Sequence, residues 1–169
     1  ANPVEITKIT PDDGGAYAHF GRFIAINDNT IIIGAPYDED GNGSAYLFDA
    51  TTGAQLAKLL ANDGAPDDSF GWGVALSGNT AAVGSGLDDD NGTNSGSVYL
   101  FNVSTGMQTA KLLPSDGDAH DHFGGSVAAS DGVLAVGATR DQDNGVFSGS
   151  AYLFDITDPE NPLESAKLL

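Results

Sequence analysis

Short hydrophobic runs, separated by turns rich in glycine, aspartate and asparagine, fill this sequence of 169 residues. The runs have the length of β-strands, and none of them keeps the period of an amphipathic helix. The 23 glycines recur at matching places in the pattern, which favours tight turns between short strands. The pattern predicts an all-β protein.

Three sequence markers recur in the same order along the chain. Phe-Gly pairs begin at Phe20, Phe70 and Phe123, separated by 50 and 53 residues. Each pair is followed by a Tyr-Leu-Phe triplet and then by a Lys-Leu-Leu motif, and a degenerate copy of the last motif stands at Lys8-Ile9-Thr10. The Tyr-Leu-Phe triplets are Tyr46–Phe48, Tyr99–Phe101 and Tyr152–Phe154. The Lys-Leu-Leu motifs are Lys58–Leu60, Lys111–Leu113 and Lys167–Leu169. The chain is therefore three copies of a unit of roughly fifty residues.

Each copy predicts four short strands. The predicted first strands are Arg22–Ile26, Trp72–Leu76 and Gly125–Ala129. The predicted second strands are Thr30–Ala35, Thr80–Ser85 and Val133–Ala138. The predicted third strands are Ser44–Phe48, Ser97–Phe101 and Ser150–Phe154. The predicted fourth strands are Gln55–Leu60, Gln108–Leu113 and Leu163–Leu169. The turns of two or three residues between the first and second strands are short enough for β-hairpins.

The second strands are apolar on both faces, as in Ile31-Ile32-Ile33, whereas a strand with one wet face would alternate. They are therefore expected inside a stack of sheets, with the small residues of the first strands at a crowded axis. We predict four-stranded blades of a β-propeller at residues 11–60, 61–113 and 114–169. A β-trefoil, which also contains three four-stranded repeats, is the alternative.

Residues 1–10 are predicted to form a strand that pairs with a neighbouring blade, because Lys8 aligns with the lysines of the fourth strands. Three blades fall short of the roughly four to eight that close a propeller. We therefore expect a homo-oligomer or a fragment of a longer propeller.

The motifs of each copy resemble the FG-GAP repeat. The third copy contains Phe123–Ala128, Leu134–Ala138 and Gly149–Phe154, and the first copy keeps both name-giving motifs, Phe20-Gly21 and Gly34-Ala35-Pro36. The resemblance extends from about Lys8 to Leu169. It implies the propeller of integrin α-subunits and of many secreted bacterial proteins.

One feature departs from the integrin repeats, in which a DxDxDG calcium loop joins the first two strands. Here that turn has only two or three residues and is too short to surround a cation. The copies are more similar to the short bacterial type, whose acidic residues lie in the next loop. Integrin calcium ligands therefore cannot be transferred to these positions.

The loop after the second strand is acidic in every copy. Aspartate and asparagine around a glycine turn supply the oxygen ligands that calcium prefers, although the same residues are common in solvated turns. The candidate metal ligands are Asp38, Asp40, Asn42, Asp88, Asp90, Asp141 and Asp143. Calcium is the expected cation, with the first loop the best candidate because it matches D-x-D-x-N-G.

The composition limits the possible partners. With 24 acidic and 6 basic residues the net charge is −18, which disfavours binding to nucleic acid or to an anionic membrane surface. The absence of cysteine excludes disulfides and thiolate metal sites, and no apolar run is long enough for membrane insertion. The sequence contains no nucleophile elbow and no phosphate-binding glycine loop, so we expect no enzyme.

Three functions stay open at this stage. The first is a secreted or cell-surface binding and adhesion module that contacts extracellular glycans or proteins, with or without calcium. The second is a non-catalytic propeller domain of a secreted carbohydrate-active enzyme. The third is a structural repeat of a surface protein or filament. Trp72 has no counterpart in the other copies, and it is either a core residue or a platform on which a sugar stacks.

Overall fold

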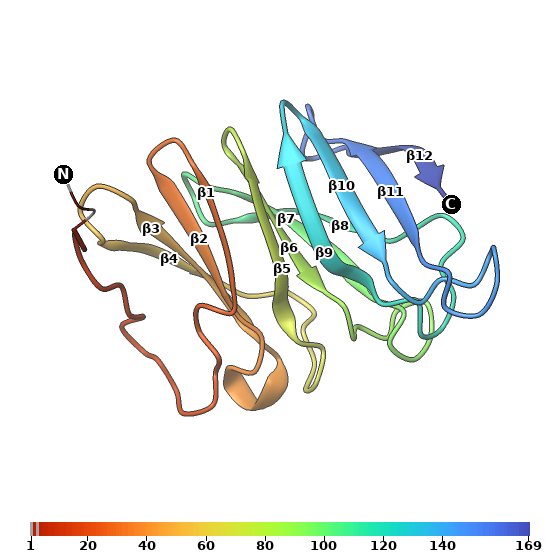
Figure 1. Ribbon diagram of the computed structural model, residues 1–169, viewed down its shortest axis with the longest axis horizontal. Coiled ribbons are helices and arrows are strands. Elements are labelled where there is room, and N and C mark those ends of the chain that lie inside the picture. Colours follow the sequence, from red (N-terminus) through yellow and green to blue (C-terminus); the bar gives the residue numbers. More distant parts are fainter. Residues whose placement is uncertain (1, 3) are drawn as a thin grey trace.

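The computed structural model describes residues 2 and 4–169 and contains three four-stranded antiparallel sheets, each a simple meander (Figure 1). The first sheet contains β1 (Phe23–Asn27), β2 (Thr30–Ala35), β3 (Ser44–Asp49) and β4 (Gln55–Leu59). The second contains β5 (Phe70–Ser77), β6 (Thr80–Ser85), β7 (Ser97–Asn102) and β8 (Gln108–Leu112). The third contains β9 (Phe123–Ser130), β10 (Val133–Ala138), β11 (Ser150–Asp155) and β12 (Leu163–Leu168). One turn of 3-10 helix, Glu39–Gly41, lies between β2 and β3.

The three sheets stand side by side as propeller blades, and β1, β5 and β9 form their adjoining inner edges (Figure 1). The predicted blades are confirmed, and every second strand has the predicted bounds. The trefoil alternative is wrong, because every strand pairs within its own four-stranded sheet.

Residues 4–10 do not form the strand that we predicted for this segment. They nevertheless lie where a fourth strand of a preceding blade would lie. A Cβ on Gly53 would be 3.2 Å from Thr7 and 3.8 Å from Ile9, just as a Cβ on Gly106 would be 3.4 Å from Ala57 in β4. A strand needs a neighbouring sheet edge for its hydrogen bonds, and the described residues contain no such edge at this position.

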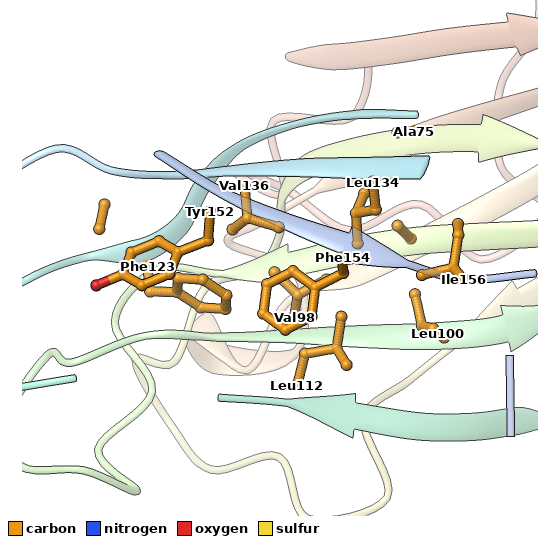
Figure 2. Close-up of a cluster of buried hydrophobic side chains, with 12 residues drawn as sticks. Ala75, Val98, Leu100, Leu112, Phe123, Leu134, Val136, Tyr152, Phe154 and Ile156 are labelled. Carbon is orange, nitrogen blue, oxygen red and sulfur yellow. The ribbon is translucent and has the colours of Figure 1, made fainter. Parts of the chain in front are cut away.

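The core lies between the sheets, where apolar faces pack against each other. Figure 2 shows the cluster between the second and third blades, in which Val98, Leu100 and Leu112 face Tyr152 and Phe154. A matching cluster fills the space between the first and second blades. Both faces of β6 are buried, as predicted for a second strand inside the stack, whereas β10 alternates buried residues with partly or fully exposed ones.

The aromatic markers of the repeat pack on each other within each blade. The ring of Phe123 meets Tyr152 edge-on with centroids 5.3 Å apart, and Phe70 meets Tyr99 in the same way at 5.5 Å. Such pairs contribute about 0.5–1.5 kcal/mol beyond their buried area. The Phe-Gly pair therefore recurs because its phenylalanine fills the space beside the tyrosine of its own blade.

The glycines of the two name-giving motifs meet where consecutive blades touch. A Cβ on Gly34 would overlap the carbonyl oxygen of Gly71, and a Cβ on Gly84 would overlap that of Gly124. Gly71 has φ +93° and Gly124 has φ +86°, a backbone region that glycine adopts without a steric penalty. Only glycine fits both sides of this contact.

Candidate functional site

Each acidic loop begins with a buried aspartate that is fixed by the third strand of the same blade. Asp38 directly follows the turn after β2 and is 6% exposed. Its carboxylate accepts hydrogen bonds from the hydroxyls of Ser44 and Tyr46, both at 2.8 Å. The corresponding Asp88 accepts bonds from Ser97 and Tyr99 at the same distance.

A lysine from the fourth strand completes each of these groups. Lys58 Nζ lies 3.1 Å from Asp38, 2.7 Å from Asp13 and 2.6 Å from Glu39. We call the lysine with its three carboxylates the lysine cluster of the blade. The clusters of the second and third blades are Lys111 with Asp63, Asp88 and Asp90, and Lys167 with Asp116, Asp141 and Asp143.

The ionisation of the first cluster follows from these contacts. Burial works against the charge of Asp38, but hydrogen bonds from Ser44, Tyr46 and Lys58 outweigh it and lower the pKa of the carboxyl group. Burial likewise opposes the charge of Lys58, and its bonds to Asp13 and the other carboxylates raise the pKa of the ammonium group. Burial and the bond to Asp38 raise the pKa of Tyr46, which keeps the phenol protonated as a donor.

The structure assigns most of the predicted metal ligands to these clusters. Five of the seven pair with a lysine ammonium, namely Asp38, Asp88, Asp90, Asp141 and Asp143. Asp40, the repeat equivalent of Asp90, lies in the 3-10 turn. Its neighbour Glu39, not Asp40, pairs with Lys58. Asn42 Oδ1 is buried without a hydrogen-bond partner. In the part of the chain that the structure describes, no group of three or more histidine, aspartate or glutamate side chains is arranged to hold a metal ion.

The lysines and the aspartates of the blade-to-blade turns are the members of the clusters that sequence reasoning missed. From the sequence alone, the lysines are only markers of the repeat, and no binding role is assigned to Asp13, Asp63 and Asp116, each of which precedes a glycine as in a turn. A signal was present, because four of the six basic residues, Lys8 included, stand at this one position of the repeat. In a chain with 24 acidic residues, a recurring buried lysine indicates a recurring carboxylate partner.

A second group of side chains interrupts the repeat where the first and second blades meet. The guanidinium of Arg22 lies 5.0 Å from the ring centre of Trp72 and 5.5 Å from that of Tyr37. Trp72 stacks on Phe23 with centroids 6.5 Å apart, and His19 meets Tyr37 edge-on at 4.8 Å. Arg22 and His19 are exposed, while the three aromatic side chains are partly exposed. We call these five residues the aromatic patch.

A cavity of about 510 Å³ opens beside the aromatic patch and shares Tyr37 with it. It is lined by the exposed ring of Tyr17, by the acidic loop Asp38–Gly41 and by Asp67. A larger cavity of about 760 Å³ lies among the β1–β2, β5–β6 and β9–β10 turns, which are at the other end of the blades (Figure 1). Its lining consists of polar and aliphatic turn residues. Among the described residues, aromatic rings and a cation therefore meet only at the end with the acidic loops.

The comparisons with known proteins agree with this architecture. The family model of the FG-GAP repeat matches residues 3–48, 54–101 and 107–154. No curated protein matches the chain. Among solved structures, the computationally designed Ika8 protein is similar with a TM-score of 0.56 and 16% identity, over 88% of this chain and 36% of that one. This chain thus spans about a third of the designed protein, and the likeness concerns the fold alone.

Three adjoining four-stranded blades define this chain as a repeat protein of the β-propeller class. It belongs to the FG-GAP repeat family, whose model covers most of its length. The second and third matches each begin before the fourth strand of one blade and end with the third strand of the next. The first match begins at residue 3, which places residues 4–10 at the fourth-strand position of the repeat. Within the described residues, no helix has the length and hydrophobicity of a membrane span.

Proposed function

We propose that this chain is a non-catalytic binding module of a secreted or cell-surface protein, and that it binds a glycan at the aromatic patch. The observation that carries the proposal is the patch itself, because its side chains break a repeat that is otherwise kept for packing. Trp72 corresponds to Arg22 in the first blade and to Gly125 in the third. FG-GAP repeats are typical of extracellular proteins, which supports the location.

The chemistry of the patch suits a sugar. A partly exposed tryptophan offers an apolar face and a polar edge, and tyrosine and arginine add hydrogen-bond donors beside it. Tryptophan, tyrosine and arginine are also the residues that contribute most at binding sites. The carboxylates that line the adjacent cavity are acceptors for the hydroxyl groups of a sugar.

Glycan arrays followed by titration calorimetry test this proposal. We expect Arg22→Ala and Trp72→Ala to weaken glycan binding by about tenfold or more, the size of effect that loss of one central contact produces. Arg22 is exposed, so its variant keeps the fold even if removal of Trp72 disturbs the packing on Phe23. Phe147→Ala is the matched control, because Phe147 is an exposed ring 5.6 Å from another arginine, in the third blade.

Two results would contradict the proposal. One is a wild-type chain that binds no glycan on the array but captures a defined extracellular protein, which would make the patch a protein-binding surface. The other is glycan binding that the patch variants and the control reduce equally. Glycan binding is shared by an adhesion module and by a propeller domain of a carbohydrate-active enzyme, and a catalytic domain in the same polypeptide would identify the second.

Calcium binding at the acidic loops stays a prediction. Because the lysine clusters occupy these carboxylates, a calcium ion would have to replace a lysine ammonium group. A calcium ion at Asp38, Asp40 and Asn42 would have to displace Lys58 from Asp38, although the free Asn42 Oδ1 would gain a partner. Thermal melts with calcium and with a chelator measure the effect. We expect calcium to raise the melting temperature of the wild-type chain and to leave Asn42→Ala unchanged. Equal melting temperatures of the wild-type chain in both solutions would leave these loops as structural turns.

A further inference from the structure

The outer face of the third blade has the same residues that the first two blades bury under their successors. Leu59 is 1% exposed and Leu112 is 4% exposed, because the next blade covers each of them, whereas the equivalent Leu168 is 52% exposed. Leu47 and Leu100 are likewise fully buried, and their equivalent Leu153 is only partly buried. This face is therefore built like an internal interface of the propeller.

The backbone of the third blade also has the features that, in the first two blades, receive the Phe-Gly segment of the following blade. Gly34 and Gly84 leave room for the Phe-Gly backbone of the next blade, and Gly137 occupies the same position. The carbonyls of Asn42 and Ser95 accept hydrogen bonds at 2.9 Å from the amides of the next Phe-Gly pair, at Phe70 and Phe123. In the third blade, the carbonyl at the position equivalent to Asn42 and Ser95 belongs to Ser148.

The outer face of the first blade carries the complementary features. Ile24 and Ile26 are 60% and 64% exposed, whereas the equivalent Val74 and Leu76 are 8% and 6% exposed against a preceding blade. Gly21 has φ +92° like its buried counterparts, but no other atom lies within 4 Å of its Cβ position. Within the described residues, the amide of Phe20 has no carbonyl partner of the kind that Phe70 and Phe123 have.

We propose that these two faces bind each other in a head-to-tail contact between two copies of this chain. The Phe20-Gly21 segment of one copy then lies on Gly137 and Ser148 of the other, and Leu168 is covered as Leu59 and Leu112 are. The occupant is a second copy because the contact uses the same repeat positions as the two interfaces inside the chain, with the Phe-Gly pair and the facing glycine unchanged. Two such contacts give six blades, within the range of about four to eight that closes a propeller.

Residues 4–10 compete with this contact. Thr7 and Ile9 lie beside Gly53 at the position where β12 of the second copy would lie. The segment has no strand pairing, and a side-chain acceptor on Gln55 holds the chain only after it, at the amide of Asp12. A segment held without backbone bonds is readily displaced, so its removal strengthens the association.

Sedimentation velocity of the full chain over a range of concentrations tests the proposal. We expect the mass to rise from 17.2 kDa toward twice that value, at lower concentration when residues 1–10 are deleted. Because each copy carries a net charge of −18, higher salt favours association by screening repulsion beyond about 10 Å at 0.1 M. Leu168→Asp and Ile24→Asp each weaken association by about tenfold or more, because each places a charge in an apolar contact.

The two variants together distinguish a contact between the two different faces from a contact between two identical faces. An equimolar mixture of Leu168→Asp and Ile24→Asp contains one intact pair of faces, so the mixture forms a dimer that neither variant forms alone. Met107→Asp, at an exposed residue of the second blade that belongs to neither face, is the control and associates like the wild-type chain. Three results overturn the proposal: a monomer at all concentrations with and without residues 1–10, face variants that associate like the wild-type chain, or a mixture that stays monomeric.

Discussion

Single lysines hold each blade together in this acidic protein. The side chain of Lys58 is 19% exposed, and its ammonium group neutralises the carboxylate of Asp38 inside the blade. The hydroxyl of Tyr46 donates a hydrogen bond to the same carboxylate. A buried pair of this kind is costly to break from one side, because the remaining charge has no partner. The recurrence of Lys, Asp and Tyr in every copy follows from this shared contact.

We expect Lys58→Met to lower the free energy of unfolding by about 3 kcal/mol at neutral pH, as removal of one partner of a buried pair does. In the wild-type chain the pKa of Asp38 is lowered, so its contribution to stability is present above the ordinary carboxyl pKa and is lost as the pH falls through the folded value. In the variant the unpaired Asp38 is stabilised by protonation instead. The difference between the two chains should therefore shrink below about pH 4.

Urea unfolding of both chains across this pH range measures the difference. Lys8→Met is the control, because Lys8 occupies the equivalent repeat position, is exposed, and makes no ion pair within the described residues. Its effect should stay under about 0.5 kcal/mol. A Lys58→Met variant as stable as this control would contradict the role of the lysine cluster.

At the scale of strands, the contact between the two name-giving glycines sets the spacing of the blades. The Cβ of an alanine at position 84 would overlap the carbonyl oxygen of Gly124 in the next blade, and backbone cannot rotate away as a side chain can. At position 137 the nearest atom is instead the hydroxyl of Ser126, on a rotatable side chain. The same substitution therefore has different consequences in the two blades.

We expect Gly84→Ala to destabilise the chain by about 3 kcal/mol, the upper part of the usual range for an overpacked core. Gly137→Ala should cost less than about 1 kcal/mol, because Ser126 can change rotamer. Thermal or urea unfolding at low protein concentration compares the two variants without contributions from association. Equal losses of stability would show that close approach of the blades is not what requires glycine at position 84.

The strands could be predicted from the sequence, because their apolar runs and turns repeat three times and the strand bounds of one copy can be compared with those of the other two. The sequence could not predict the partners of the acidic loops, because Lys58 and Asp38 are brought together by pairing of β3 with both β2 and β4. Residues 4–10 have no strand pairing among the described residues, and their pairing with a further blade stays a prediction. Lys8 identifies the repeat position, but a strand also needs a neighbouring edge.

At the scale of the whole molecule, the repeat and its interruption have separate roles. The lysine clusters, the aromatic markers and the glycine contacts recur in every blade or at every blade junction and hold the propeller architecture. The aromatic patch occurs once, between the first and second blades, and it is there that we place ligand binding. Because Trp72 is the only tryptophan of the chain, the patch contains its own spectroscopic reporter.

The most direct test of the binding account is the intrinsic fluorescence of Trp72 during titration with the glycans that bind on an array. The account predicts a saturable change in the emission of Trp72, with a midpoint equal to the dissociation constant from calorimetry, because the sugar replaces water on the indole ring. Arg22→Ala should shift that midpoint to higher glycan concentration, and Phe147→Ala should leave it in place. Calorimetric binding of a glycan with no change in the emission of Trp72 would contradict the account.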